Sequence, residues 1–183
     1  MLKDLSLEEL WELFPITFVD SNIKFEKQFL TEKENLELLS GNSIKRISHI
    51  GSTAIKSIKT KPIVDILIET DFDNKDIIKE ILLNNHYILM REAPDKISFN
   101  KGYTINGYAD TVFHIHIKEF GDCDELYFRD YLNDNLSKAK EYEKLKEELY
   151  NKYKPNRDLY TAGKTEFVAK IVNTAKERYK DRY

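Results

Sequence analysis

The sequence contains few of the residues and patterns that mark secreted, fibrous or membrane-spanning proteins. Cys123 is the single cysteine, so no disulfide can form within the chain. The 183 residues include only 6 glycines and 4 prolines, which excludes a collagen-like chain and argues against disorder. The longest apolar stretches, such as 66–68, are far too short to cross a bilayer, and no signal-peptide pattern follows Met1. We therefore expect a cytoplasmic protein with no membrane partner.

The sequence also lacks an excess of positive charge. Its 29 Lys and Arg residues against 32 Asp and Glu residues give a formal net charge of -3. This balance argues against a nucleic-acid partner, so any phosphate site must be local. With 41% hydrophobic residues, the chain can bury a substantial core. We predict a single domain over residues 1–183, in which an α/β core with N-terminal helices (1–121) carries a packed helical extension (122–183).

The spacing of apolar residues predicts a fold of the α+β class. Apolar residues at helical intervals predict helices, and a capping box marks the start of the first one. Runs rich in β-branched residues predict strands. The expected helices are 7–14, 23–39, 74–84, 124–153 and 158–179, with a short one in 52–60, and the expected strands are 44–50, 62–69, 87–92, 96–101 and 111–118. We therefore expect a sheet in the middle of the chain and helices in the C-terminal third.

A Gly-Ser turn follows the first predicted strand. Gly51 permits a close approach of the backbone, and the hydroxyls of Ser52 and Thr53 are suited to hold a phosphate beside free N–H groups. His49 stands next to this turn in the sequence. The alternative is an ordinary strand-to-turn connection that binds no ligand, since such short signals recur by chance.

Asp65 lies within an apolar strand, where an unpaired carboxylate is costly to bury. Such a residue needs a metal or a cation beside it. Lys61, four residues earlier at the mouth of the same strand, could neutralise a substrate phosphate. The structural alternatives are an Asp65 paired with a lysine or a backbone N–H, and a Lys61 that is simply solvated.

Two histidines alternate with apolar residues in a later strand. His114 and His116 therefore project from one face, about 6.6 Å apart along the strand axis. Together with Asp65 they offer nitrogen and oxygen ligands for a divalent metal such as Mg, Mn or Zn. The alternatives are that both histidines hydrogen-bond to Asp65 and serve as acid–base groups, or that they are structural.

Basic residues elsewhere supply further phosphate-binding candidates. Arg129, early in a helix, can bind phosphate or an internal acid such as Asp130. Lys101 lies at a strand end, next to Tyr103, whose ring could cover a base. The mixed charges of 141–148 predict a solvated helix face.

Several of these motifs together resemble the GrpB family, also called UPF0157, within the nucleotidyltransferase-like superfamily. The resemblance covers nearly the whole chain and implies a mixed sheet with the Gly-Ser turn beside it and flanking helices. The blocks that carry it, in order, are 10–15, 49–54, 61–67, 113–117, 126–132, 139–146 and 160–167.

The resemblance also shows one departure that bears on activity. Active members of the wider superfamily carry two metal-binding carboxylates at alternate positions of one strand and a third on a neighbouring strand. Here the first is Asp65, but the second position is Leu67 and the third falls on the His114 strand. We expect a protein that binds a nucleotide or phosphorylated small molecule, with metal-dependent nucleotidyl or phosphoryl transfer as its activity. The alternatives are a catalytically inactive ligand-binding or adaptor module and a His/Asp metal-dependent hydrolase.

Overall fold

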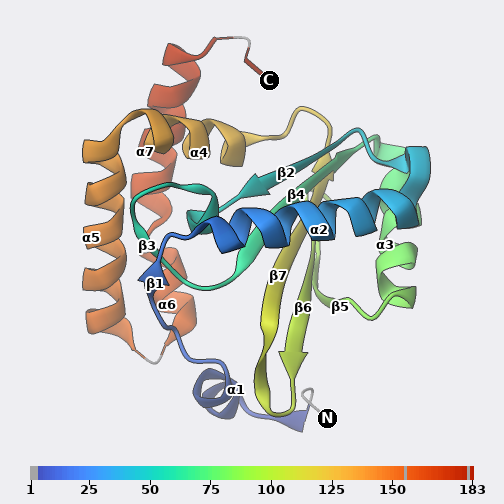
Figure 1. Cartoon of the computed structure of the whole chain (residues 1–183), viewed down its shortest axis with the longest axis horizontal. Coiled ribbons are helices and arrows are strands. Elements are labelled where there is room, and N and C mark those ends of the chain that lie inside the picture. Colours follow the sequence, from blue (N-terminus) through green and yellow to red (C-terminus); the bar gives the residue numbers. More distant parts are fainter. Residues whose placement is uncertain (1–3, 155, 181) are drawn as a thin grey trace.

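A five-stranded mixed β-sheet forms the centre of the protein (Figure 1). The computed structural model describes residues 4–154, 156–180 and 182–183. The strand order is β2-β4-β7-β6-β5, in which β4 and β7 are parallel and the other neighbours are antiparallel. The strands are β2 (Arg46–Ile50), β4 (Val64–Thr70), β5 (Ile88–Glu92), β6 (Ile97–Thr104) and β7 (Gly107–Glu119). The α+β class predicted from the sequence is confirmed.

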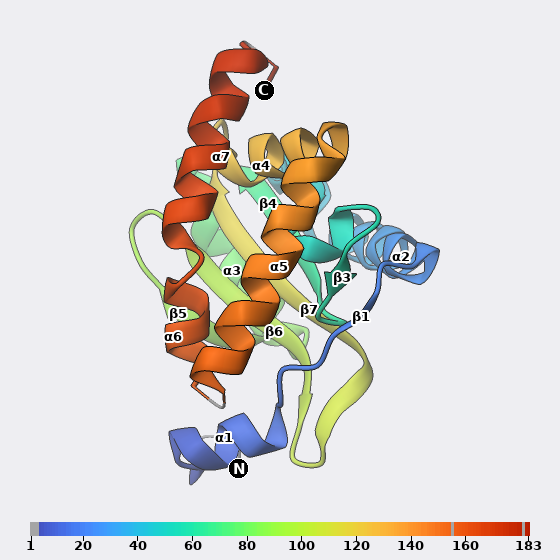
Figure 2. The same cartoon turned by 90° about the vertical axis from the view of Figure 1, so that its left-hand side faces the viewer.

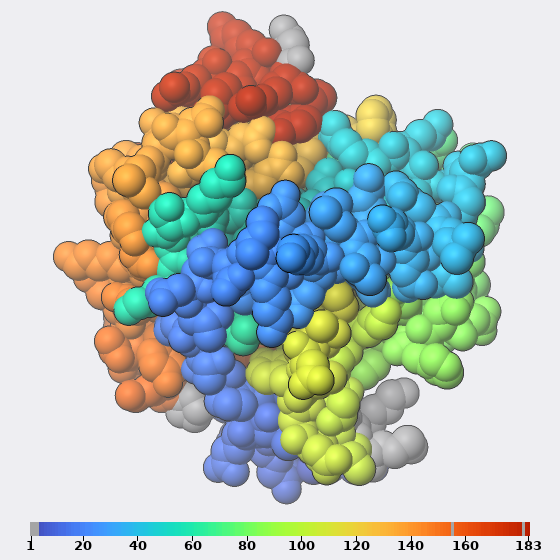
Figure 3. Space-filling view, in the orientation of Figure 1, coloured from blue at the N-terminus to red at the C-terminus, as the bar shows by residue number. Residues whose placement is uncertain are grey.

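Two helices cover one face of this sheet. They are α2 (Ile23–Ser40) and α3 (Lys75–Asn84), and Figure 3 shows α2 lying across the front of the molecule. Asn22 caps α2 by accepting a hydrogen bond from the backbone N–H of Lys24 at 2.9 Å. Apolar side chains of both helices and of the strands pack into the main hydrophobic core. This face of the sheet is therefore closed to solvent.

The C-terminal helices lie on the opposite side of the sheet, and Figure 2 turns them toward the viewer. They are α4 (Asp124–Asp134), α5 (Leu136–Tyr153), α6 (Arg157–Ala162) and α7 (Thr165–Arg178). The first of them contacts the sheet directly, because Leu126 packs with Ile50 and Leu67. Among the described residues, no helix combines the length and the apolar character that crossing a membrane requires.

Each of the two long C-terminal helices expected from the sequence is in fact two helices. The expectation of one helix over 124–153 is wrong because Asn135, with φ −132° and ψ 83°, interrupts it. The expectation of one helix over 158–179 is wrong because α6 ends at Gly163 before α7 begins. A Cβ at Gly163 would lie 2.4 Å from Cδ2 of Leu149, so α5 and α6 approach closely there. The breaks let α4 pack on α7 and α5 pack on α6.

The segment between β2 and β4 also differs from the prediction. Instead of a helix in 52–60, a single 3-10 turn (Ser52–Ala54) leads into the short strand β3 (Lys59–Thr60). This strand pairs with β1 (Val19–Asp20) in a separate two-stranded sheet, which the sequence did not predict. The first helix, α1 (Leu7–Leu13), begins with the predicted capping box. A nine-residue window was too short for its composition to separate a helix from a turn and a strand.

Candidate functional site

The pairing of the strands places three polar side chains on one face of the sheet. Asp65 of β4 is the register partner of His114 of β7, and His116 follows two residues later. Because side chains alternate along a strand, all three point away from the main core, to which Ile66 and Ile115 between them belong. The three predicted catalytic residues therefore share one face.

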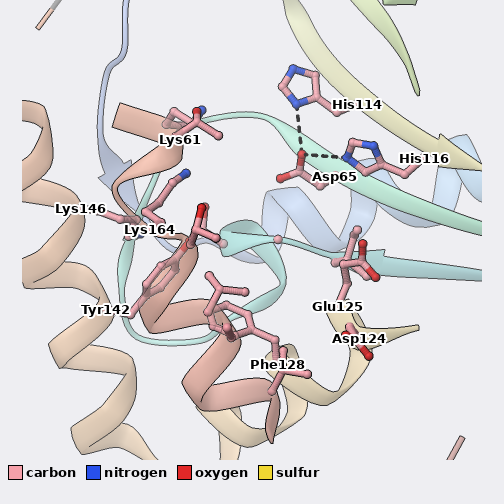
Figure 4. A pocket seen from close by; sticks show the side chains of 18 of the residues that line it. Lys61, Asp65, His114, His116, Asp124, Glu125, Phe128, Tyr142, Lys146 and Lys164 are labelled. Atoms are coloured by element: carbon pink, nitrogen blue, oxygen red, sulfur yellow. Dashed lines mark hydrogen bonds and ion pairs between the residues drawn. The ribbon is translucent and has the colours of Figure 1, made fainter. Parts of the chain in front are cut away.

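A cavity of about 730 Å³, the first cavity, lies between this face and the C-terminal helices (Figure 4). Its volume is that of a small-molecule site. The predicted residues that line it are Gly51, Ser52, Lys61, Asp65, His114 and His116. The Gly-Ser turn, the aspartate strand and the histidine strand thus meet in one place.

Asp65 is the hydrogen-bonded centre of the first cavity. Its Oδ1 lies 3.1 Å from Nδ1 of His114 and 4.0 Å from Nε2 of His116. Burial by itself raises the pKa of the Asp65 carboxyl, but the hydrogen bond and charge of His114 and the other cations lower it to about 2. The carboxylate is therefore ionised at neutral pH.

His114 links Asp65 to Tyr103, which lies in the part of β6 beyond the predicted strand. The Tyr103 hydroxyl is 2.8 Å from Nε2 of His114. Because the ionised Asp65 can only accept, Nδ1 of His114 carries a hydrogen and donates to the carboxylate, which leaves Nε2 to the Tyr103 hydroxyl. The two bonds fix the ring and its tautomer, as proton transfer by a histidine requires.

His116 is held as a neutral ring. Its Nδ1 lies 3.2 Å from Oγ of Ser98, and burial lowers its pKa to about 3. In the described part of the chain, no group of three or more His, Cys, Asp and Glu side chains is placed to hold a metal ion. Asp65, His114 and His116 therefore do not fit a three-ligand Mg, Mn or Zn centre, and of the two histidines only His114 hydrogen-bonds to Asp65.

Gly51 brings the Gly-Ser turn against the carboxylate. Its φ of +70° lies in the region that favours glycine, and a Cβ there would be 2.2 Å from Oδ2 of Asp65. The neighbouring Ser52 hydroxyl is hydrogen-bonded to the Thr60 hydroxyl of β3. The close approach predicted at Gly51 is present, and it is made toward Asp65.

His49 and Thr53 do not line the first cavity, which corrects their assignment to phosphate binding. Residue 50, not residue 49, is the register partner of Asp65, so His49 points to the opposite face and stacks on Phe29 at 4.9 Å between ring centroids. Its Nε2 lies 2.9 Å from Oγ1 of Thr53, which donates to the Ile63 carbonyl at 3.2 Å. Burial lowers the pKa of His49 to about 4. Both residues fasten the turn to the core.

Lys101 and Arg129 are also outside the first cavity, and each is paired with an internal acid. Nζ of Lys101 donates to both carboxylate oxygens of Glu32, at 2.8 and 2.9 Å. Arg129 donates to Asp130 at 2.7 Å and to the His49 carbonyl at 2.9 Å. The assignment of both residues to phosphate binding is corrected, because their donors are already used. Glu32 pairs with Lys101 from far away in the sequence, and Asp130 pairs with Arg129 from the same helix.

Leu67 occupies the position where the wider superfamily carries its second carboxylate. Its side chain is fully buried and packs with Ile50, Cys123 and Leu126. The position therefore joins the sheet to α4 through apolar contacts and offers no oxygen to a ligand.

Three lysines, which we call the lysine cluster, project into the first cavity from three different elements. They are Lys61 before β4, Lys146 of α5 and Lys164 between α6 and α7. Burial, with repulsion from Lys164, lowers the pKa of Lys61 to about 7 and that of Lys146 to about 8, and burial also lowers the pKa of Lys164. Asp65 opposes the shift at Lys61 and Lys164, yet within the described chain no carboxylate forms an ion pair with any of the three.

Sequence reasoning missed the role of Lys146, although a signal for it was present. The helix face over 141–148 was expected to be solvated, but Lys146 is only 2% exposed and donates to the Lys59 carbonyl. It shares its side of α5 with the buried Tyr142 and Leu149, at helical intervals of four and three residues. A lysine that lies between apolar residues on one side of a helix is the pattern that indicates a buried lysine.

Two paired acids and one unpaired hydroxyl also line the first cavity. Asp124 is paired with Lys176, and Glu125 with Lys118 at 3.1 Å. The hydroxyl of Tyr160, a residue 1% exposed, has no hydrogen-bond partner in the described chain. The acids are therefore neutralised, while the cations and this hydroxyl are free to contact a ligand.

The fold and site together define an α+β protein with a cation-lined cavity beside a mixed sheet. Comparisons with known proteins identify its family. The family described as GrpB protein matches residues 15–174. The glutamate-rich protein GrpB of Alkalihalophilus pseudofirmus is 37% identical over 169 residues, covering 86% of this chain and 94% of that protein. UPF0157 protein YqkA of Bacillus subtilis is 32% identical over 97% of this chain, which spans 52% of that protein.

A solved structure agrees with the same assignment. The crystal structure of the conserved protein GrpB from Enterococcus faecalis superposes with a TM-score of 0.77 at 25% identity, covering 89% of this chain and 99% of that one. The chain therefore belongs to the GrpB (UPF0157) family, as the motifs in its sequence indicate.

Proposed function

We propose that the first cavity binds a nucleotide or a similar phosphorylated small molecule, with its phosphates at the lysine cluster. The observation that carries this proposal is the lowered pKa of Lys61 and Lys146, two lysines held together with Lys164 and without a paired carboxylate. Like charges withdrawn from water are unfavourable unless an anion compensates them. A ligand that carries several negative charges supplies that compensation.

The hydroxyl of Tyr160 supports the same ligand class. It is buried, lacks a partner among the described residues and belongs to the wall that carries Lys164. A phosphate oxygen accepts hydrogen bonds from hydroxyl and ammonium donors alike, so one phosphate group would satisfy both kinds of donor. The wider nucleotidyltransferase-like resemblance of the Gly-Ser turn and Asp65 is consistent with this ligand.

Nucleotidyl or phosphoryl transfer is the activity that we propose for this site. In such chemistry a protein mainly positions the reacting groups and offsets the charge that develops on phosphate oxygens. The lysine cluster would offset this charge. The Tyr103 hydroxyl, which hydrogen-bonds to Nε2 of His114, would take the proton of an attacking hydroxyl while its own proton passes to Nε2. Asp65, His114 and His116 do not fit a three-ligand metal centre. A Mg²⁺ ion carried on the phosphates would need only one or two protein carboxylates.

Binding without transfer is a second candidate, and Leu67 favours it. The buried leucine leaves Asp65 as the single carboxylate of the motif. A site that keeps the phosphate-binding cations but lacks the second metal carboxylate can retain a ligand without reacting it.

Calorimetric titration with inorganic tripolyphosphate tests the binding proposal. We expect Lys146→Met to weaken binding by about tenfold or more, because charge-assisted hydrogen bonds to the anion are lost. Lys144→Met is the matched control, since it removes the same charge from a side chain on the same helix that is 77% exposed. Equal affinities of the two variants, or no binding by the parent protein, would refute the proposal.

A turnover assay separates the two candidate functions. The protein is incubated with each of the four nucleoside triphosphates and Mg²⁺ or Mn²⁺, and released pyrophosphate and phosphate are measured. Release that is lost in His114→Gln supports transfer. Binding of the same nucleotides without any release supports the binding module.

A further inference from the structure

A second cavity of about 490 Å³ adjoins the first one and has a different chemical character. It lies where α1 and strands β5 and β6 meet the start of α6. His114, Arg157 and Thr161 line both cavities and so form the boundary between them. A ligand of sufficient length can therefore occupy both.

The walls of the second cavity are largely apolar and partly aromatic. Helix α1 and the loop after it contribute Trp11 and Phe14, and β5 contributes Met90. Two apolar side chains of these walls are left substantially in contact with solvent, Leu7 at 58% and Met90 at 56% exposure. An aromatic ring placed here would remove such surface from water and pack against other rings.

A polar side chain in the second cavity can hydrogen-bond to the edge of a heterocyclic ring. Asn100 is 9% exposed, and its amide forms no hydrogen bond within the described chain. A side-chain amide offers a donor and an acceptor side by side, which is the pattern that complements the edge of a heterocyclic base. The Asn100 amide has no hydrogen-bond partner among the described residues, so its donor and its acceptor are available to a base.

We propose that the second cavity holds the base of a nucleotide whose phosphates lie at the lysine cluster. This inference rests on the proposed function for the phosphate end of the ligand. The base would lie among Trp11, Phe14 and Met90 with its edge at Asn100, and Arg157 would stand at the sugar–phosphate junction between the cavities. The ligand class is thereby narrowed from phosphorylated small molecules to nucleotides.

The hydrogen-bonded series from Asp65 to Tyr103 connects the two cavities. Asp65 lines the first cavity, Tyr103 lines the second, and His114 between them lines both. Arg157 also lines both cavities, and its guanidinium interacts electrostatically with Tyr108 and Tyr103. A nucleotide that spans the boundary would thus contact the acid–base group His114 with the part of the ligand that joins base and phosphates.

The fluorescence of Trp11 provides a direct measurement, because it is the single tryptophan of the chain. The full-length protein is titrated with adenosine, guanosine, cytidine and uridine, with their 5′-triphosphates, and with inorganic tripolyphosphate. We expect at least one triphosphate and its nucleoside to change the Trp11 emission, and tripolyphosphate to bind by calorimetry without a comparable change.

Two variants and a matched control locate the effect. Met90→Glu places a charge in the apolar wall at an exposed position that the fold tolerates, and Asn100→Leu removes the amide. Leu38→Glu is the control, because Leu38 is 85% exposed on α2 and lines neither cavity. We expect Met90→Glu and Asn100→Leu each to weaken the nucleoside triphosphate by about tenfold, since base stacking and edge contacts are lost. Tripolyphosphate affinity should stay unchanged in all three.

The outcomes separate this inference from the proposed function. Binding of tripolyphosphate with no Trp11 response to any of the eight nucleosides and nucleotides overturns the base site alone. A Trp11 response to a nucleoside without tripolyphosphate binding supports the base site and refutes the phosphate site. Absence of both refutes both, and equal losses in Leu38→Glu and Met90→Glu also overturn the base site.

Discussion

The two faces of the central sheet differ, although the same strands build both. Toward α2 and α3, the central positions of β4 and β7 present apolar side chains that are buried in the main core, among them Ile66, Ile68, Ile115 and Ile117. Toward the C-terminal helices, the alternate positions present Asp65, His114 and His116, and a cavity lies above them. Alternation along a strand thus lets each residue on the core face stabilise the fold while its neighbour on the other face stays available for a ligand.

The polar face is kept open by the way its helices cover it. Helix α4 touches the sheet near Leu67 and Ile50. Helix α7 packs mainly on α4, and α5 packs on α6 and α4, so these helices contact one another and the segment between β2 and β4. On this face Asp65, His114 and His116 hydrogen-bond or pair within the described chain, whereas the lysine cluster has no paired carboxylate and the Tyr160 hydroxyl and the Asn100 amide have no hydrogen-bond partner there. We therefore expect substitutions on the core face to lower stability and substitutions on the polar face to weaken ligand binding.

The largest expected effect comes from neighbouring residues of β7 that point to opposite faces. Ile115→Ala should cost about 2–5 kcal/mol of unfolding free energy, because Ile115 is fully buried in the main core. His116→Ala should cost about 0.5–1.5 kcal/mol, since a neutral ring loses one hydrogen bond to Ser98. Urea denaturation measures both. Equal losses would break the distinction between the faces.

Two glycines with positive φ test the packing of the turn against Asp65. Gly51→Ala meets both an unfavourable φ and a carboxylate oxygen 2.2 Å away, whereas Gly41→Ala has φ +54° and nothing within 4 Å. Backbone strain alone costs about 1–3 kcal/mol in each. We expect Gly51→Ala to lose more stability than Gly41→Ala and also to lose tripolyphosphate binding. Retention of binding by Gly51→Ala would show that the position of Asp65 does not matter for the ligand.

The pH dependence of stability tests whether Lys146 on the polar face is buried as a cation at a cost. Lys146 has a pKa of about 8 in the folded protein, below its ordinary value near 10.5, so the unfolded chain binds the extra proton between these values. Stability contributed by this group therefore rises with pH from about 8 to about 10.5, by roughly 1–3 kcal/mol. Lys146→Met should flatten the rise relative to the exposed control Lys144→Met. Parallel curves for the two variants, measured by urea denaturation across this range, would contradict the prediction.

The smallest expected effect is the number of protons that the first cavity takes up when a ligand binds. With a pKa of about 7, Lys61 is mostly neutral at pH 8 in the free protein and becomes charged when an anion binds beside it. We expect tripolyphosphate binding at pH 8 to take up about one proton per site. Titrations in two buffers of different ionisation enthalpy measure this number. Uptake that persists unchanged in Lys61→Met would assign the proton to another group.

Much of the site follows from local patterns in the sequence. The alternation of His114 and His116 with apolar residues has a period of two, which fixes a shared face whatever the strand pairs with. Likewise, the roles of Gly51 and Asp65 follow from their residue types, because glycine tolerates a positive φ and a buried aspartate needs a partner. The α+β class follows from apolar periodicity in the same way, since each element can be read within its own window.

Tertiary structure alone decided which other side chains reach the first cavity. His49 faces the core because β2 pairs with β4 in a register that sets Ile50 opposite Asp65, and one residue of register reverses every side chain. Lys101 is paired with Glu32, 69 residues away in the chain. Lys146 and Lys164 lie beside Lys61 because α5, the junction of α6 and α7, and the segment before β4 meet at the first cavity. Local sequence encodes the propensity and the face of an element. The partner of a charge depends on contacts between distant elements, which form only when the whole chain packs.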